Sequence, residues 1–171
     1  MGIRDLKSFL SSKTEKELIE EISGLYRHFK NVRDFYDVQL SQDHAVDLLK
    51  QHKKILKDEF LPQRGFGDAR LSVARKTVMD YKKIVGLNEN LADLALYYVE
   101  IGVQYTNTYG DIDEPFYNSM ETMFEQALKW MKQLNLLASF QSRAEKICAE
   151  TENIGWGFHD MLGQIYSDYF D

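Results

Sequence analysis

Four histidines and one cysteine are the side chains whose spacing can be tested first for metal or nucleophile chemistry. A di-iron helical bundle needs a glutamate three residues before each of its ligating histidines. No histidine of this chain has one: the residues three before His28, His44, His52 and His159 are Leu25, Ser41, Leu49 and Trp156. His44 and Asp47 share a helical face, but no third ligand is evident. The sequence therefore predicts neither a metal site nor another cofactor.

The acidic run from Asp111 to Glu114 resembles the start of a calcium-binding loop. Such a loop has glycine at its sixth position and glutamate at its twelfth, where this chain has Phe116 and Thr122. An acidic residue followed closely by Pro115 is instead typical of a helix start. We expect Asp111, Asp113 and Glu114 to cap a helix.

Cys148 falls at a core position of a predicted helix. A catalytic thiol needs an accessible, cationic setting, and no neighbouring residue in the sequence supplies one. A lone cysteine also excludes an internal disulfide, which favours a reducing compartment such as the cytoplasm. The first ten residues lack the continuous apolar stretch of a signal peptide. The longest apolar run, 91–103, is interrupted by Asp93 and Glu100, so we expect no membrane span.

The segment 155–160 combines aromatic side chains, an imidazole and a carboxylate with two flexible glycines. Loops with such content can bind ligands, so one hypothesis is a small-ligand binder or enzyme with a pocket near Trp156 and His159. Arg70 or Arg75 would then serve as an anion clamp. The competing interpretation is a packed helix junction anchored by Trp156.

The charges of the chain are unevenly distributed around a net charge of −6. Residues 50–83 carry ten Lys or Arg against four acidic residues, whereas 84–128 carry eight acidic residues and no Lys or Arg. Successive helices could pair these flanks within the chain, and a dipolar surface could instead orient a charged partner. The residues that we expect on either surface are Arg64, Arg70, Arg75, Lys76, Asp111, Asp113 and Glu114. Nucleic-acid binding through the 50–83 basic helices is a weaker hypothesis, because the whole chain is acidic.

Apolar residues recur every three to four positions from Leu18 to Tyr169, which predicts amphipathic helices. The stripe from Leu18 to Phe29, for example, follows two possible capping boxes, Ser12-x-x-Glu15 and Thr14-x-x-Glu17, and predicts a helix that buries one face. We count about seven helices and no strand. The predicted fold is a single all-α domain over residues 1–171, an irregular antiparallel bundle. The runner-up is a HEAT/TPR-like α-α superhelix, since helix starts near 68, 114 and 156 are spaced like helix pairs.

Three segments resemble an uncharacterised bacterial family of small helical proteins, catalogued as a domain of unknown function. They are residues 67–76, 109–118 and 155–159. The resemblance extends over nearly the whole chain and implies one helical domain. It assigns no activity, so it implies no catalytic or binding residue.

Without a catalytic constellation, the sequence favours a non-catalytic helical protein-interaction or scaffold module. Its partner would be an unknown protein or a second copy of the chain, with nucleic acid disfavoured and no membrane involved. The ligand pocket near Trp156 and His159 is the alternative.

Overall fold

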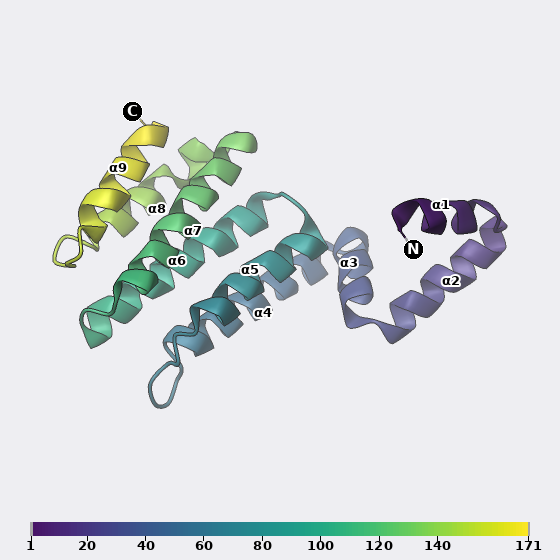
Figure 1. Cartoon of the computed structure of the whole chain (residues 1–171), viewed down its shortest axis with the longest axis horizontal. Helices are drawn as coiled ribbons and strands as arrows, with labels where there is room; N and C mark the ends of the chain where they lie inside the picture. Colours follow the sequence, from purple (N-terminus) through teal and green to yellow (C-terminus); the bar gives the residue numbers. More distant parts are fainter. Residues whose placement is uncertain (1, 171) are drawn as a thin grey trace. The chain divides into compact units, whose positions relative to one another are not determined.

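The structure is helical along almost the whole chain, as the spacing of the apolar residues predicts. The computed structural model describes residues 2–170, and within that range it contains nine α-helices and no β-strand (Figure 1). The predicted all-α class is therefore confirmed, with nine helices rather than about seven. The two additional helices are residues 3–11 and 30–40.

The chain forms two compact units, Met1–Ala45 and Val46–Asp171. We call them the N-terminal unit and the helical stack, and each is described by itself. The single domain expected from the sequence stays a prediction.

The N-terminal unit contains α1 (Ile3–Ser11), α2 (Glu15–His28), α3 (Lys30–Leu40) and the first residues of α4 (Gln42–Phe60). The predicted capping box starts α2: the Thr14 N–H donates to Glu17 Oε2 at 2.8 Å, and Thr14 Oγ1 accepts from the Glu17 N–H at 3.3 Å.

One extended residue, Phe29, separates α2 from α3 (φ −117°, ψ 116°) and bends the chain there. Arg33 Nη2 donates to the carbonyl oxygen of Arg27 at 3.0 Å and so satisfies an end group of α2.

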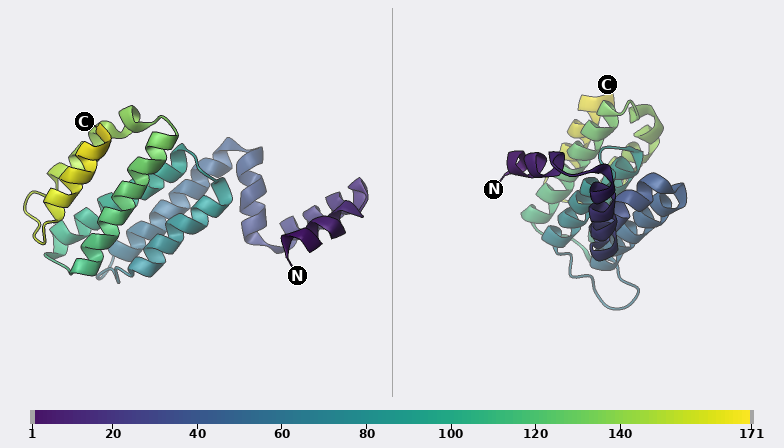
Figure 2. Two further views of the ribbon diagram at one scale, coloured as in Figure 1. Left: turned by 45° about the horizontal axis from the view of Figure 1, so that its top comes forward. Right: turned by 90° about the vertical axis from the view of Figure 1, so that its right-hand side faces the viewer.

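The helical stack consists of three antiparallel helix pairs. They are residues 46–60 of α4 with α5 (Leu71–Val85), α6 (Glu89–Tyr109) with α7 (Glu114–Gln133), and α8 (Leu137–Ala149) with α9 (Phe158–Phe170). Helices α4, α6 and α8 lie in one layer and α5, α7 and α9 in the other (Figures 1 and 2). The second helices of the pairs start at 71, 114 and 158, close to the spacing that suggested a helix-pair repeat.

The core of the stack is centred on α6, which has eleven buried residues. Phe60 of α4 packs edge-on against Tyr98 of α6, with ring centroids 5.8 Å apart, and both side chains are inaccessible to solvent. Gly102 allows α7 to approach α6 closely, since a Cβ atom there would overlap the Met120 side chain. Burial of this kind removes a large apolar area from water and supplies the main stabilising free energy of the fold.

A charge network crosses the layer of α4, α6 and α8. Lys53 Nζ lies 2.6 Å from Asp93 Oδ2, and Arg143 donates both to Asp93 and to Glu100. Burial alone would lower the pKa of Arg143, but hydrogen bonds to Glu100 and Asp93 outweigh burial and raise that pKa above its usual range. The network therefore joins α4, α6 and α8, the three helices of this layer.

Candidate protein-interaction surface

Arg70, one of the predicted binding residues, is part of the framework of the stack. Its Nε and Nη2 donate to the two carboxylate oxygens of Glu59, both at 2.9 Å, and its backbone N–H donates to Glu59 Oε1 at 2.7 Å. The side-chain hydrogen bonds from Arg70 are the main cause of a lowered pKa for Glu59, which is buried on α4. The guanidinium group of Arg70 links the start of α5 to the end of α4 and already has the Glu59 carboxylate as its partner.

Most of the basic side chains of residues 50–83 are likewise paired. Within the described residues, six of the ten form ion pairs, including Lys76 Nζ with Asp80 Oδ2 at 2.5 Å. Arg64 is exposed in the loop between α4 and α5, and Arg75 is exposed on α5. A phosphate backbone would have to compete with these carboxylates for most of the positive charge.

The three predicted acidic residues serve the start of α7. Asp113 is the N-cap and accepts the Phe116 N–H at 2.9 Å, and Glu114 is the first helical residue. Asp111 Oδ1 accepts from the Tyr117 hydroxyl at 2.9 Å. The capping role predicted from the sequence is confirmed for Asp113.

The expected pairing of these acidic residues with the basic helices is wrong. Across the described residues, no ion pair joins Asp111, Asp113 or Glu114 to the basic segment. The ion pair that links the two oppositely charged segments is Lys53–Asp93. Asp93 and Glu100 are held mainly by Arg143, which lies outside both segments.

Trp156 and His159 lie at the turn between α8 and α9. Trp156 is 62% exposed and has a positive φ of 63°, while Phe158 is fully buried. The junction is therefore anchored by Phe158 rather than by Trp156. His159 Nδ1 lies 2.9 Å from Thr151 Oγ1 and 3.2 Å from the carbonyl oxygen of Cys148, so one ring nitrogen is engaged with the end of α8.

Neither Trp156 nor His159 has a hydrogen bond or ion pair to Arg70 or Arg75 in the described part of the chain. The absence of such a bond does not test the predicted anion clamp, which stays a prediction.

The remaining candidates for reactive groups in the described residues are metal-binding clusters and the thiol of Cys148. Among residues 2–170, no three His, Cys, Asp or Glu side chains gather closely enough to hold a metal ion. Burial raises the pKa of Cys148 to about 11, which keeps the thiol protonated near neutral pH. As far as the chain is described, none of its helices has both the length and the apolar character needed to cross a bilayer.

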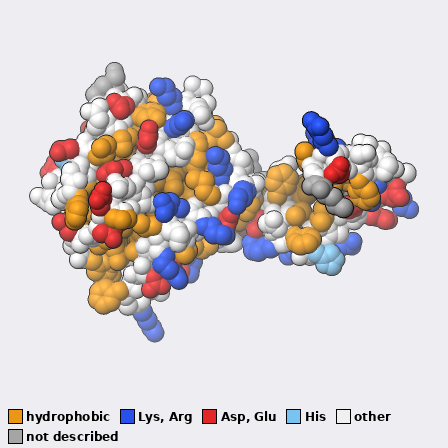
Figure 3. All heavy atoms as spheres, in the orientation of Figure 1, with side chains coloured by type: hydrophobic (Ala, Val, Ile, Leu, Met, Phe, Trp, Pro, Cys, Tyr) orange, Lys and Arg blue, Asp and Glu red, His pale blue; other side chains and the backbone are white. Residues whose placement is uncertain are grey.

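The N-terminal unit leaves its apolar side chains open to solvent. No residue of α1, α2 or α3 is buried. The large apolar side chains exposed by between 41% and 79% are Ile3, Leu6, Phe9, Ile19, Ile22, Leu25, Phe29, Phe35 and Leu40. Figure 3 shows hydrophobic side chains at the surface of these helices. The prediction that α2 buries one face is therefore wrong: the helix forms, but within this structure its apolar face stays uncovered.

The apolar side chains of α2 and of Phe29, the residue that follows it, have the spacing of a coiled-coil seam. Leu18, Ile22, Leu25 and Phe29 follow one another at intervals of four, three and four residues. Leu18 is half-buried, and the other three are 41–53% exposed. We call these four residues the α2 seam. It presents a continuous apolar stripe at the surface of the N-terminal unit.

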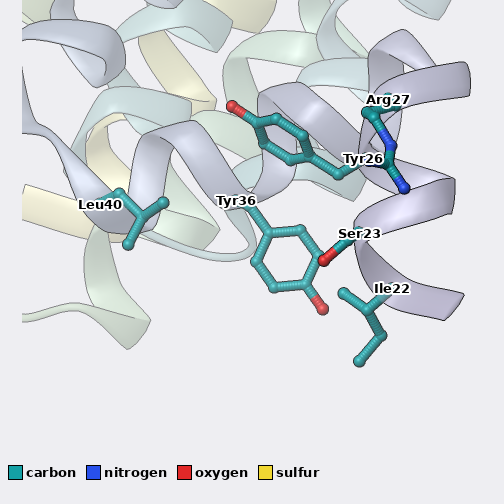
Figure 4. A pocket seen from close by; sticks show the side chains of 6 residues that line it. All are labelled: Ile22, Ser23, Tyr26, Arg27, Tyr36 and Leu40. Carbon is teal, nitrogen blue, oxygen red and sulfur yellow. The ribbon is translucent and has the colours of Figure 1, made fainter. Parts of the chain in front are cut away.

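A groove between α2 and α3 adjoins the α2 seam (Figure 4). Its volume is about 360 Å³, and its lining residues are Ile22, Ser23, Tyr26, Arg27, Tyr36 and Leu40. The Tyr26 hydroxyl donates to Asp37 Oδ1 at 2.5 Å, which holds α3 beside α2 and raises the pKa of Tyr26. Because Ile22 belongs to both, the groove and the seam form one surface.

Charged and polar residues flank the α2 seam along one edge. On a helical projection, Glu21 and His28 lie on this edge, and Ile19 and Tyr26 lie on the other. Lys13 Nζ lies 2.6 Å from Glu21 Oε2. His28 is exposed and has no hydrogen bond or ion pair within the described residues. The seam thus has one titratable edge and one largely apolar edge.

Sequence reasoning missed this surface because spacing identifies an apolar face without showing what covers it. The four-three-four spacing of the α2 seam was a usable signal, but the same periodicity marks the buried helices of the stack. The role of Arg143 was also missed, since its partners lie 43 and 50 residues away in the sequence.

Comparison with known proteins gives one result for this chain. Residues 1–171 match the model of a family described as "Family of unknown function (DUF6155)". No curated protein and no solved structure matches the chain.

Proposed function

The chain belongs to the DUF6155 family, whose description assigns no activity, and from its surfaces we propose that it is a non-catalytic helical protein-interaction module. The proposed docking surface is the α2 seam together with the adjoining α2–α3 groove. The bound element would be an apolar helical face of a protein, because two such faces can bury each other at helical spacing.

The observation that supports this proposal is the uncovered apolar face of the N-terminal unit. Its three complete helices contain no buried residue, although α2 and α1 each carry large apolar side chains on one side. Contiguous exposed apolar surface on a soluble protein usually marks an interaction site. Covering the α2 seam would remove Ile22, Leu25 and Phe29 from water. Because these side chains are 41–53% exposed, each would contribute roughly half of the 1.5–3 kcal/mol that full burial of such a side chain supplies.

The two alternative functions have less support. A ligand pocket near Trp156 and His159 would need an open imidazole, and one nitrogen of His159 is engaged with Thr151 and Cys148. Nucleic-acid binding would need unpaired basic side chains, and most of those in residues 50–83 have carboxylate partners. A cytoplasmic location is part of the proposal, because the lone Cys148 suits a reducing compartment.

A site-specific photocrosslinking amino acid tests the proposal in cells of the source organism. The probe replaces Leu25, which is 41% exposed in the α2 seam, and in a control it replaces Met161, which is 47% exposed on α9. We expect protein adducts at position 25 in excess of those at position 161, identified by mass spectrometry. Equal yields at both positions, or adducts to lipid alone at position 25, would contradict an interaction module that uses this surface.

A further inference from the structure

Resting on the proposed interaction surface, we propose that the α2 seam binds the α2 seam of a second copy of the chain, antiparallel across a two-fold axis. A two-fold contact uses the same patch on both copies, so each residue of one seam must suit its opposite in the other. The α2 seam and its edges meet this requirement.

The apolar residues form complete layers in the antiparallel arrangement. With the axis passing between Ile22 and Leu25, Ile22 of one copy faces Leu25 of the other, and Leu18 faces Phe29 of the other copy. Each layer occurs twice. All four seam residues therefore have an apolar counterpart, as knobs-into-holes packing requires.

The edges of the seam also suit an antiparallel pair. In this register Glu21 lies opposite His28 of the second copy, again twice, and Ile19 lies opposite Tyr26 of the second copy. A parallel pair would place Glu21 against Tyr26 of the second copy instead. Glu21, whose Oε2 already pairs with Lys13 of the same copy, therefore gains a second hydrogen-bonding or ionic counterpart, His28 of the other copy, when the two helices run in opposite directions.

The charge of the N-terminal unit favours another copy over a lipid surface. Residues 1–45 carry seven Lys or Arg and eight Asp or Glu, so two copies of this unit repel each other little. Four glutamates lie in the first half of α2, at positions 15, 17, 20 and 21. Helices that lie on anionic membranes carry Lys and Arg on their polar face, so these glutamates would oppose such binding.

Charge substitutions at the titratable edge test the direction of the pairing. Sedimentation equilibrium of the full chain gives the dimer dissociation constant at one fixed pH and salt concentration. His28→Lys places an ammonium group opposite Glu21 at two symmetric positions of the antiparallel dimer and should tighten it, by about three- to tenfold for two exposed ion pairs. His28→Glu places two like charges together and should weaken it by a similar factor. The double variant Glu21→Lys/His28→Glu exchanges the charges and should restore the dimer.

Further variants and outcomes separate this inference from the proposed function. Leu25→Asp should give a monomer, and circular dichroism should show that all variants keep their helix content. The inference is overturned if the unmodified chain stays monomeric, if His28→Lys and His28→Glu act alike, or if the double variant does not recover. Adducts at position 25 that contain only a different protein would also overturn it while leaving the proposed interaction module intact.

Discussion

The N-terminal unit and the helical stack are built from the same kind of helix but use its apolar side differently. All buried hydrophobic side chains of the described residues belong to the stack, whereas α1, α2 and α3 bury none. Helix α6 has neighbours in both layers and is buried along most of its length, while α2 has α3 beside it across a single bend. Amphipathic spacing therefore specifies which side of a helix is apolar, and the number of neighbouring helices decides whether that side is buried.

The sharpest test of this comparison removes the same aromatic ring from each region. Phe60→Ala should destabilise the stack by about 3–5 kcal/mol, because it leaves a cavity beside Tyr98 and Phe116. Phe29→Ala should cost about 1 kcal/mol or less, since 53% of Phe29 is already exposed.

Urea unfolding at a protein concentration well below the dimer dissociation constant, followed by circular dichroism and by tryptophan fluorescence, measures both effects in the single chain. Fluorescence reports on the stack, because Trp130 and Trp156 both lie in residues 46–171. Similar losses for the two variants would show that Phe29 is covered in solution, and the contrast between the regions would disappear.

Breaking the charge network of the stack should give the second-largest loss of unfolding free energy. Arg143→Ala leaves Asp93 and Glu100 half-buried without their main partner, and breaking such a pair is destabilising. Because the Arg143 side chain is 30% exposed, we expect about 2 kcal/mol, below the cost of breaking a fully buried pair. Lys146→Ala, on the exposed side of the same helix, is the control and should change the free energy of unfolding by less than about 0.5 kcal/mol. A loss as small as that of the control would mean that the network contributes little.

The Arg70–Glu59 pair should give a smaller effect that depends on pH. Arg70→Ala removes hydrogen bonds to a carboxylate, so we expect it to destabilise the fold near pH 7 by less than Arg143→Ala does, because Arg70 is exposed. Because Arg70 lowers the pKa of folded Glu59, this stabilisation is complete above the unfolded value, near 4.5. It is lost as the pH falls through the lower folded value. The difference between the unmodified chain and Arg70→Ala should therefore shrink below pH 4.5.

Chemical unfolding at pH 7, 5, 4 and 3 measures this difference. Arg75→Ala is the matched control, because Arg75 is exposed on α5 and should give a small effect at every pH. A difference for Arg70→Ala that stays constant down to pH 3 would argue against the assigned role of Glu59.

The smallest effect on unfolding is expected in the α2 seam. Leu25→Lys should alter the unfolding free energy of the isolated chain by about 0.5 kcal/mol, since an exposed position tolerates a long polar side chain. Val99→Lys, at a fully buried position of α6, should prevent the stack from folding. Thermal unfolding at low protein concentration compares the two. Severe destabilisation by Leu25→Lys would show that the seam is part of a core rather than an open surface.

Much of the local structure was predictable from the sequence because its causes are local. The capping box at Thr14, the N-cap at Asp113 and the helical period of the apolar residues all act within a few positions. The helix start expected near residue 68 was the exception: α5 begins after Arg70, which Glu59 of the preceding helix fixes in place. That cause lies eleven residues away and leaves no local signal.

The candidate surface was less predictable because it depends on contacts between distant residues. Charge counts directed attention to residues 50–128, yet Arg143 and neighbouring carboxylates neutralise much of that region. The α2 seam looked like any other core stripe, and only the absence of a covering helix distinguishes it.

The extended backbone of Phe29 interrupts a single heptad register that runs through residues 18–36. If Phe29 adopted helical dihedral angles, α2 and α3 would fuse into a single rod of about 39 Å. Val32 and Tyr36 would then continue the line of Leu18, Ile22, Leu25 and Phe29 at three- and four-residue steps. The Tyr26–Asp37 hydrogen bond and the Arg33 contacts oppose that straightening. The φ and ψ angles of Phe29 thus determine whether residues 15–40 form two helices joined at a bend or one long helix.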